Sequence, residues 1–295
     1  MENVVKEIYV KSVLNKHKKR DEWFLDDYSL NPYRLCQFNC VYCYIRGSRY
    51  GENMGKELAV KVNAPTVLAR ELKRRANKKE YGFIALGSAT EPWMPIEEKY
   101  MVTRRCLEII ARYRFPVHCL TKSTLIQRDL DLLKEIDRNA VLPEDLKTLK
   151  HGVLITFSLS TLREEIAKIF EPGAPSPEER LEALKKVKKE GFYAGIAYIP
   201  VLPFISDSDE ELEEMTKTAK RLQVDYVFFG TLTLQGESRN LYFRVLRKNF
   251  PQLVEKYRRI YVKWYPLKKY CNAFYRKTYS LCKKYNVKIG IIELK

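Results

Sequence analysis

The sequence predicts an α/β protein whose parallel strands form an open or partial barrel. From residue 65 onward, amphipathic helical segments alternate with short apolar strands. Such alternation builds a parallel sheet through right-handed crossover connections. Six strands are predicted, fewer than the eight that close a complete barrel. We therefore predict a partial (β/α)6 barrel.

The predicted strands are short apolar runs bounded by glycine or polar residues. They cover residues 28–30, 81–87, 116–121, 152–158, 192–199 and 224–229. The helices between them are predicted at residues 65–79, 95–113, 125–138, 162–170, 176–189 and 207–222. Ser176 and Pro177 suit the N-cap and the first turn of their helix, which supports that boundary.

The two ends of the chain depart from this alternation. Residues 1–27 have no long periodicity, and we interpret them as an N-terminal arm before the barrel core at 28–235. Residues 236–295 read as a basic, mainly helical C-terminal extension, with two or three helices and a last strand at 287–294.

The composition indicates a protein of the cytoplasm. The chain of 295 residues is 45% apolar, enough for a full core, but no apolar run is long enough to span a bilayer. Its start has no signal-peptide pattern, so we expect a cytoplasmic protein that is not in a membrane. In that reducing compartment the seven cysteines are not a disulfide framework.

Most of the net charge of +17 comes from the C-terminal end. Residues 239–295 hold 16 lysines and arginines against Glu255 and Glu293, a local charge of +14. Eight tyrosines and Trp264 are interleaved with these cations. Cations neutralise phosphates and aromatic rings stack on unpaired bases, so a DNA or RNA partner is one interpretation. The alternative is that the rings face the core and the cations form a solvated helix face.

Three cysteines lie within eight residues, as C-x3-C-x2-C at Cys36, Cys40 and Cys43. Thiolates gathered on one loop are soft ligands that suit iron–sulfur or zinc chemistry. A structural zinc site needs four ligands, and no fourth cysteine or histidine follows nearby. Three cysteines on a cluster of four irons would leave one iron open to another ligand. The alternative is a structural site completed by a distant ligand.

This loop resembles that of the radical S-adenosylmethionine (radical SAM) enzymes, and its context, Asn31-Pro-Tyr-Arg-x-Cys-x-x-x-Cys-x-Tyr-Cys-Tyr44, is similar to the spore photoproduct lyase-like branch. The resemblance implies a TIM-like partial barrel with a 4Fe-4S cluster on the three cysteines. In that family the open iron binds the methionine of SAM, and the reduced cluster cleaves SAM to a 5′-deoxyadenosyl radical. An electron donor such as ferredoxin or flavodoxin is then a partner.

Candidate SAM contacts follow two of the predicted strands, since parallel sheets place function at the carboxyl ends of their strands. Thr90 and Glu91 follow the strand at 81–87, where the family carries residues that hold the methionine ammonium. The alternative for Glu91 is an acid at the start of the next helix. Lys122 ends the strand at 116–121, where the resemblance implies a contact to the SAM carboxylate. The alternative is a solvated charge.

The two following strands complete the candidate site. Thr156, Ser158 and Ser160 share one face, and hydroxyl groups facing a barrel interior need polar partners. The resemblance implies that Ser158, with Ser160 beside it, contacts SAM; the alternative is that the hydroxyls bond one another and ordered water. The resemblance also implies that Gly195 and Ile199 lie beside the adenine, with main-chain contacts from Tyr42.

The residue that would donate a hydrogen atom is not identified. A repair lyase of this branch uses a cysteine just before the strand-end threonine, and this sequence has Ser88 there. A hydroxyl is a far poorer hydrogen-atom donor than a thiol, so the resemblance does not carry the repair reaction. The other cysteines, at positions 106, 119, 271 and 282, are predicted to be small buried residues.

Three functions remain. The leading hypothesis is a radical SAM enzyme that acts on nucleic acid or a nucleotide. The second is the same chemistry on a peptide or small molecule, and the third is a non-catalytic, metal-stabilised nucleic-acid binder.

Overall fold

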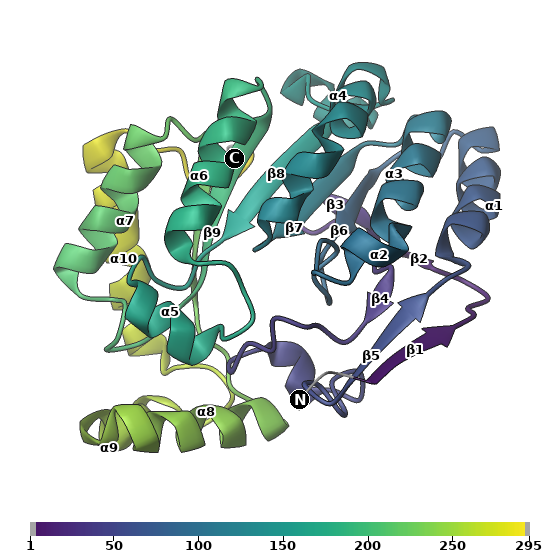
Figure 1. Cartoon of the computed structure of the whole chain (residues 1–295). Coiled ribbons are helices and arrows are strands. Elements are labelled where there is room, and N and C mark those ends of the chain that lie inside the picture. Colours follow the sequence, from purple (N-terminus) through teal and green to yellow (C-terminus); the bar gives the residue numbers. More distant parts are fainter. Residues whose placement is uncertain (1–3, 293–295) are drawn as a thin grey trace. The chain divides into compact units, whose positions relative to one another are not determined.

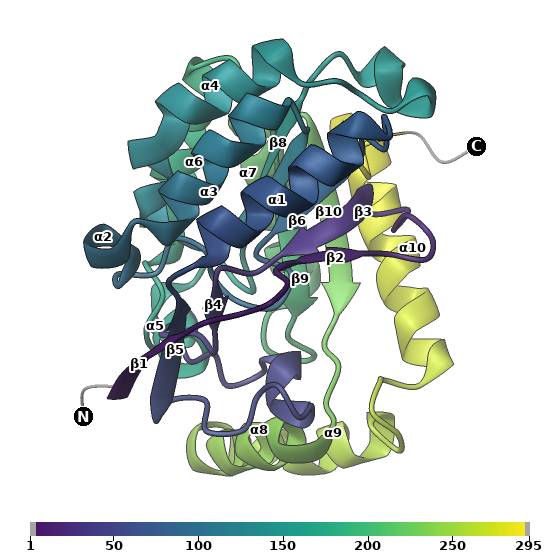
Figure 2. The same ribbon diagram turned by 90° about the vertical axis from the view of Figure 1, so that its right-hand side faces the viewer.

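The protein is a mixed α/β fold with parallel strands, described over residues 4–292 by a computed structural model (Figures 1 and 2). Its residues group into two compact units. Unit 1 takes the described residues of Met1–Gln37 with Gly55–Thr156 and Lys185–Ala194, and unit 2 takes Phe38–Met54, Phe157–Leu184 and Gly195–Lys295. Strands β8 (Val153–Ser158) and β9 (Tyr193–Val201) pass from one unit to the other.

The main sheet of unit 1 has the strand order β8-β7-β6-β3-β2. Besides β8 its strands are β2 (Leu14–Lys16), β3 (Asp26–Leu30), β6 (Phe83–Leu86) and β7 (Val117–Thr121). β3, β6 and β7 are parallel neighbours, with Leu30 opposite Leu86 and Leu86 opposite Cys119. Their carboxyl ends therefore share one edge, where candidate residues Thr90, Glu91 and Lys122 follow. The predictions of strands at 28–30, 81–87 and 116–121 are confirmed.

A second, three-stranded sheet in unit 1 was not predicted. β5 (Glu57–Lys61) lies between β1 (Val4–Ile8) and β4 (Tyr33–Arg34), in parallel with β1 and antiparallel with β4. These strands are short, and β1 is mostly exposed, so neither length nor an apolar run marks them in the sequence.

Helices α1 (Ala64–Asn77), α3 (Val102–Tyr113) and α4 (Leu130–Asn139) accompany the strands of unit 1, with α3 in contact with both others. The single helix predicted at 95–113 is wrong: α2 (Glu97–Tyr100) ends at Met101, whose left-handed backbone breaks it from α3. The helix predicted at 125–138 begins instead as the 3-10 turn η2 (Thr124–Asp129). A further 3-10 turn, η3 (Glu144–Leu149), follows α4.

Unit 2 continues the alternation. Its elements are α5 (Glu164–Phe170), α6 (Pro177–Lys189, whose last residues belong to unit 1), β9, α7 (Asp209–Arg221) and β10 (Tyr226–Thr231). β10 runs parallel to β9, with Tyr226 opposite Gly195. The predicted cap of α6 is confirmed, since Ser176 Oγ accepts from the Glu179 amide at 3.2 Å and Glu179 Oε2 accepts from the Ser176 amide at 2.6 Å. The two strands and three helices predicted here are confirmed.

The C-terminal part of unit 2 is helical. It contains α8 (Gly236–Asn249), the turn η4 (Pro251–Leu253), α9 (Val254–Ile260) and α10 (Lys268–Tyr285). α10 contacts α7, and its buried residues are Phe274, Thr278 and Cys282. The strand predicted at 287–294 is wrong over 287–292, which form only one bridge, between Ile289 and Val227. Positions 293 and 294 lie outside the described residues.

His118 is a buried histidine at the start of β7. Its ring lies 2.8 Å from the Phe24 carbonyl through Nδ1 and 2.6 Å from the Thr156 hydroxyl through Nε2. These partners suit a neutral ring in which Nδ1–H donates to the carbonyl and Nε2 accepts from the hydroxyl. Desolvation by burial lowers the pKa of His118 from 6.5 to about 4.

This histidine makes the fold sensitive to acid. Between pH 6.5 and 4 the unfolded chain binds a proton at this position and the folded chain does not, so the free energy of unfolding falls as the pH falls through this window. The loss is about 3 kcal/mol and ends below pH 4. We expect denaturant unfolding at pH 7 and pH 4.5 to show that His118→Gln has a smaller difference than the unaltered chain. Equal differences in both proteins would contradict this origin.

Candidate functional site

The predicted site residues belong to both units, and each unit is described by itself. Unit 1 holds Cys36, Thr90, Glu91 and Lys122. Unit 2 holds Cys40, Tyr42, Cys43, Ser158, Ser160, Gly195 and Ile199. The continuous loop from Cys36 to Cys43 joins the two sets.

The cysteine loop is a turn-rich segment. Cys40 is buried, while Cys36 and Cys43 are half-buried. Left-handed backbone at Leu35 and Asn39 turns the chain just before Cys36 and Cys40. Within the described residues no three His, Cys, Asp or Glu side chains are already gathered as a metal site. The donor set nevertheless suits iron and sulfide, because it offers three thiols within eight residues.

Segments of unit 2 fasten this loop from several sides. The Val41 amide donates to the Phe170 carbonyl at 2.8 Å, and the Gly173 amide donates to the Phe38 carbonyl at 3.1 Å. Arg46 Nε donates to the Cys40 carbonyl at 3.1 Å. The loop is therefore held by the end of α5 and by its own arginine.

Tyr42, the aromatic residue before the last cysteine, is buried and donates its hydroxyl to Glu171 Oε1. Burial, followed by the Glu171 carboxylate, raises the pKa of Tyr42 well above its usual value, so the hydroxyl stays protonated and donates. Sequence reasoning considered only main-chain contacts of Tyr42 and missed this side-chain bond.

Asn31 organises the segment after β6. Its Oδ1 accepts from the Ala89 amide at 3.0 Å and from the Thr90 amide at 3.2 Å, and its Nδ2 donates to Ser88 Oγ at 3.2 Å. Thr90 Oγ1 also donates to Asn31 Oδ1, at 3.4 Å. Asn31 follows β3 and so connects the carboxyl ends of two neighbouring strands. It stands in the quoted motif but was not assigned a role.

Glu91 connects the next pair of strand ends. Its Oε1 accepts from the Thr121 hydroxyl at 2.6 Å and the Trp93 amide at 3.1 Å, and Oε2 accepts from the Lys122 amide at 2.8 Å. It is therefore not an acid of the α2 N-terminus, which was the alternative. Burial raises the pKa of Glu91, while these hydrogen bonds act in the opposite direction.

Lys122 stands where β7 ends, and Gly87 marks the end of β6 beside it. A Cβ on Gly87 would lie 2.1 Å from the Leu120 carbonyl oxygen, and the backbone there has a φ of +92°. Only glycine permits this approach, which brings the ends of β6 and β7 together. The Lys122 side chain is half-buried at this edge.

The three hydroxyls of Thr156 and Ser158 on β8 and of Ser160 just after it have different surroundings. The Thr156 hydroxyl contacts His118, and Ser158 Oγ donates to the Ile199 carbonyl at 3.2 Å. Ser160 Oγ is buried and has no hydrogen-bond partner among the described residues. A buried hydroxyl without a partner is costly, so Ser160 fits a site that a polar ligand completes.

Gly195 and Ile199 on β9 have packing roles. A Cβ at Gly195 would lie 2.4 Å from the Tyr226 carbonyl oxygen and 2.5 Å from its ring, so glycine is needed for the close approach of β10. Ile199 occupies the space left by Gly230, where a Cβ would lie 2.9 Å from its Cγ1. Packing explains the glycine at position 195 without a ligand.

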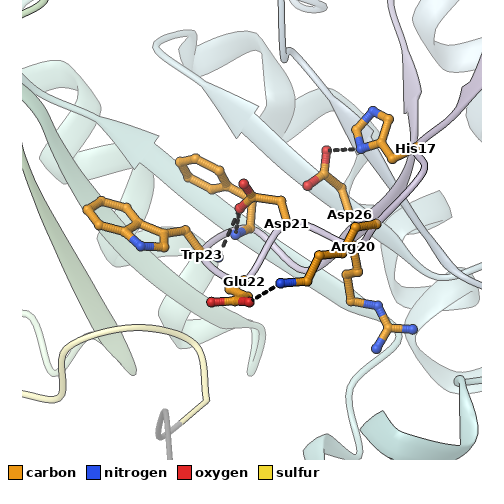
Figure 3. A pocket seen from close by; sticks show the side chains of 8 residues that line it. His17, Arg20, Asp21, Glu22, Trp23 and Asp26 are labelled. Carbon is orange, nitrogen blue, oxygen red and sulfur yellow. Dashed lines mark hydrogen bonds and ion pairs between the residues drawn. The ribbon is translucent and has the colours of Figure 1, made fainter.

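A cavity of about 490 Å³ lies elsewhere in unit 1, around the start of β3 (Figure 3). His17, Lys19, Arg20, Asp21, Glu22, Trp23, Phe24 and Asp26 line it. Its charged groups largely pair with one another, as in the contacts of His17 with Asp26 at 3.3 Å and of Lys19 with Glu22 at 2.5 Å. It lies at the amino end of β3, so it is separate from the strand ends that carry the candidate residues.

The other four cysteines do not join the site. Cys106, Cys119 and Cys282 are buried, as predicted, and burial raises their pKa. The prediction is wrong for Cys271, which is half-buried and lies 3.5 Å from the Pro266 carbonyl oxygen. It begins the buried side of α10 next to an exposed loop, where packing is incomplete.

Several uncharacterized proteins are similar in sequence. One from Acidianus two-tailed virus is 30% identical over 224 residues, which cover 72% of this chain and 69% of that protein. One from Mycobacterium tuberculosis is 29% identical over 240 residues, covering 79% and 67%. The radical SAM Nalpha-GlyT isomerase of Pseudomonas phage M6 is 24% identical over 175 residues, covering 59% of this chain and 33% of the isomerase.

Solved structures of spore photoproduct lyase have a similar fold. Its complex with dinucleoside spore photoproduct has a TM-score of 0.69 and 15% identity, covering 95% of this chain and 79% of the lyase. A variant with bound AdoMet and dinucleoside spore photoproduct has a TM-score of 0.66 and 16% identity, covering 88% and 74%. At this identity the likeness is one of fold.

The sequence profile of the radical SAM superfamily matches residues 30–219, which include the cysteine loop and all the candidate SAM contacts. That family is one of enzymes that use SAM and an iron–sulfur cluster and generally need a reductant. No described helix is long and apolar enough to cross a membrane. The chain therefore belongs to the radical SAM superfamily.

Proposed function

We propose that this enzyme holds a 4Fe-4S cluster on Cys36, Cys40 and Cys43 and acts on nucleic acid or a nucleotide. When bound and reduced, the cluster supplies the electron that cleaves SAM. Residues 28–235 carry this chemistry, residues 236–295 contact the substrate, and residues 1–27 form an arm. A ferredoxin or flavodoxin is the proposed electron donor.

The chain's own residues have defined tasks in this proposal. The Lys122 ammonium neutralises the SAM carboxylate, and the hydroxyls of Thr90, Ser158 and Ser160 offer hydrogen bonds to SAM. Glu91 holds the ends of β6 and β7 in register through its three acceptor contacts. The backbone groups of Tyr42, Gly195 and Ile199 line the part of the site that would bind the adenine of SAM.

The observation that carries the substrate class is a chain of contacts in unit 2 between the cysteine loop and an exposed aromatic and basic surface. The turn that follows Cys43 ends at Gly47, which lies against Gln235, so that a Cβ on Gly47 would be 2.6 Å from Gln235 Cγ. The turn η1 (Tyr44–Gly47) packs on α8, as Figure 2 shows. Leu234, the neighbour of Gln235, donates its amide to the Trp264 carbonyl at 2.6 Å.

Trp264 belongs to a group of exposed residues that we call the basic aromatic surface. Its members are Lys263, Trp264, Tyr265, Lys268, Lys269, Tyr275, Arg276, Tyr279 and Lys283. None of its cations forms an ion pair with a described carboxylate, whereas Lys284 is paired with Glu213 at 2.7 Å and Lys277 with Asp209. Exposed rings among unpaired cations suit unstacked bases and phosphates.

The other interpretation holds for part of this region. Tyr242, Tyr257 and Tyr261 are fully buried, and their hydroxyls bond one another or backbone carbonyls. These three rings are core, and the proposal rests on the exposed ones. One structure of similar fold agrees with it, since spore photoproduct lyase was solved in complex with a dinucleoside spore photoproduct.

The proposal is tested with the anaerobically reconstituted, reduced protein, SAM and cellular RNA or DNA. We expect 5′-deoxyadenosine and a new nucleoside mass in digests of one of the two nucleic acids. If 5′-deoxyadenosine forms, the nucleosides stay unchanged and a peptide or small molecule is modified instead, the substrate is a peptide or small molecule rather than nucleic acid.

Lys122→Met tests the assignment of the SAM carboxylate. A charge-assisted hydrogen bond contributes about 1.5–3 kcal/mol, so its loss should weaken SAM binding about tenfold or more. Equilibrium dialysis with labelled SAM measures this, with Lys73→Met, an exposed residue of α1, as the control. If both variants bind SAM as the unaltered protein does, Lys122 is a solvated strand-end charge.

A further inference from the structure

Glu171 and Arg180 form a buried ion pair for which the proposed chemistry has no role. Both side chains are about 1% exposed, and Arg180 Nη2 lies 2.5 Å from Glu171 Oε2. They lie on either side of the turn between α5 and α6, nine positions apart. Two opposite charges withdrawn from water rarely add stability compared with apolar residues of the same volume. Stability alone therefore does not explain the pair.

The contacts of Glu171 lead to the cysteine loop. Its Oε1 accepts the hydroxyl of Tyr42, which lies between Cys40 and Cys43. The backbone around it fastens the same loop, through the bond from the Val41 amide to the Phe170 carbonyl and the bond from the Gly173 amide to the Phe38 carbonyl. The segment from Phe170 to Gly173 thus holds both ends of Phe38–Tyr42.

The contacts of Arg180 lead to the end of β8. Its Nη1 donates to the Ser158 carbonyl at 3.1 Å, and its Nε donates to the Pro175 carbonyl at 2.8 Å. The planar guanidinium donates to two carbonyls and forms the ion pair with Glu171, a set of contacts that one lysine ammonium at the same place does not reproduce. A single side chain thus joins Glu171, and through it the cysteine loop, to the strand end that carries Ser158.

We propose that Glu171 and Arg180 are positioning residues that set the cysteine loop against the end of β8, so that a cluster on the loop and SAM at Ser158 meet in the reactive geometry. This rests on the proposed cluster and SAM site. Neither residue touches the reacting atoms: Glu171 acts through the Tyr42 hydroxyl, and Arg180 acts through the Ser158 carbonyl. Residues that hydrogen-bond to metal ligands without touching the metal orient those ligands. Their loss commonly lowers metal affinity or activity 10- to 100-fold.

Three variants separate the contacts. Tyr42→Phe removes one hydroxyl, Glu171→Gln keeps an acceptor for Tyr42 but removes the charge facing Arg180, and Arg180→Lys keeps the charge but not the three-way contact. The matched control is Tyr198→Phe, which removes another buried hydroxyl whose bond, 2.8 Å to the Met215 carbonyl, does not involve the loop.

The first measurement is hydrogen exchange of the full chain without cluster or SAM. We expect the amides of residues 38–44, including that of Val41, to exchange about tenfold faster in the three variants. In Tyr198→Phe these amides should exchange as in the unaltered chain. The measurement does not depend on a cluster, so it tests whether Glu171 and Arg180 hold the cysteine loop even if the proposed function fails.

The second measurement uses the reconstituted proteins. We expect about tenfold weaker SAM binding and a smaller change of the electron paramagnetic resonance spectrum on SAM addition, at unchanged iron content. If the variants match Tyr198→Phe in exchange and in SAM affinity, the pair is only structural and the proposal is wrong. If the unaltered protein itself binds no SAM, the proposed function fails instead. If Glu171→Gln or Arg180→Lys does not fold, the same measurements on Tyr42→Phe still test the proposal.

Discussion

Cys40→Ala should abolish the formation of 5′-deoxyadenosine and leave the affinity for RNA or DNA intact. Cys40 is the central thiol of the loop, and its carbonyl is held by Arg46 Nε at 3.1 Å. Three thiolates on a cluster of four irons leave one iron for SAM, and two thiolates no longer hold the cluster firmly. The measurements are the iron and sulfide content, the amount of 5′-deoxyadenosine by chromatography, and filter binding of oligonucleotides.

The matched control is Cys106→Ala. This thiol is fully buried in α3, and burial raises its pKa. Because it lies in the core, its replacement removes one sulfur atom from the core and leaves the cysteine loop intact. We expect Cys106→Ala to keep the iron content and the 5′-deoxyadenosine formation of the unaltered protein. Formation of 5′-deoxyadenosine by Cys40→Ala at the level of the unaltered protein would contradict the assignment of the cluster.

The same pair of variants separates the enzyme from the two non-enzymatic interpretations. A structural metal site would contain zinc rather than iron and sulfide, and Cys40→Ala would then unfold the loop. A metal-stabilised nucleic-acid binder would form no deoxyadenosine before any substitution. Membership of the radical SAM superfamily argues against both.

The strand and helix pattern was predictable because each element carries its own local signal. The six strands are apolar runs ended by glycine or polar residues, and Ser176 with Pro177 marks the start of α6. The signal fails where the backbone conformation depends on tertiary contacts. Met101, for example, breaks a long apolar periodicity with a left-handed residue that its side chain does not favour.

The candidate site was predictable only where residues follow strands or stand in the cysteine motif. Glu91 and Lys122 were singled out from their places after β6 and β7, but the bond from the Lys122 amide to Glu91 was not. Glu171 and Tyr42 are 129 positions apart, and neither belongs to a pattern that points to the other. Pairings at that separation arise only when the chain has folded.

The C-terminal region illustrates the limit of composition. Charge and aromatic content suggested one surface, yet the structure divides the rings between a core group around Tyr257 and an exposed group around Trp264. On α10, Tyr275, Tyr279 and Lys283 follow one another at intervals of four and form an exposed stripe, while Phe274 and Cys282 face inward. Among the described residues of this region, the exposed rings lie on this stripe and its neighbouring loop.

Trp264→Ala and Tyr279→Ala should each weaken binding of single-stranded oligonucleotides about tenfold, because stacking on a base contributes about 1–3 kcal/mol. Lys268→Ala with Lys269→Ala should make the fall of log affinity with log salt shallower by about 0.7 for each phosphate that the protein no longer neutralises. Filter binding across a salt series measures both effects, and duplexes of the same sequence, whose bases are already stacked, should respond little to the aromatic variants.

Controls come from the same helix and from an exposed aromatic elsewhere. Lys277 and Lys284 already pair with carboxylates of α7, so their alanine variants should change the salt dependence less than Lys268→Ala with Lys269→Ala. Trp23, 39% exposed in unit 1, supplies Trp23→Ala as the counterpart of Trp264→Ala. A near-flat salt dependence, or equal losses in all variants, would remove nucleic acid as the partner of this surface. The exposed rings would then favour a protein or peptide partner, since aromatic side chains are enriched in protein interfaces.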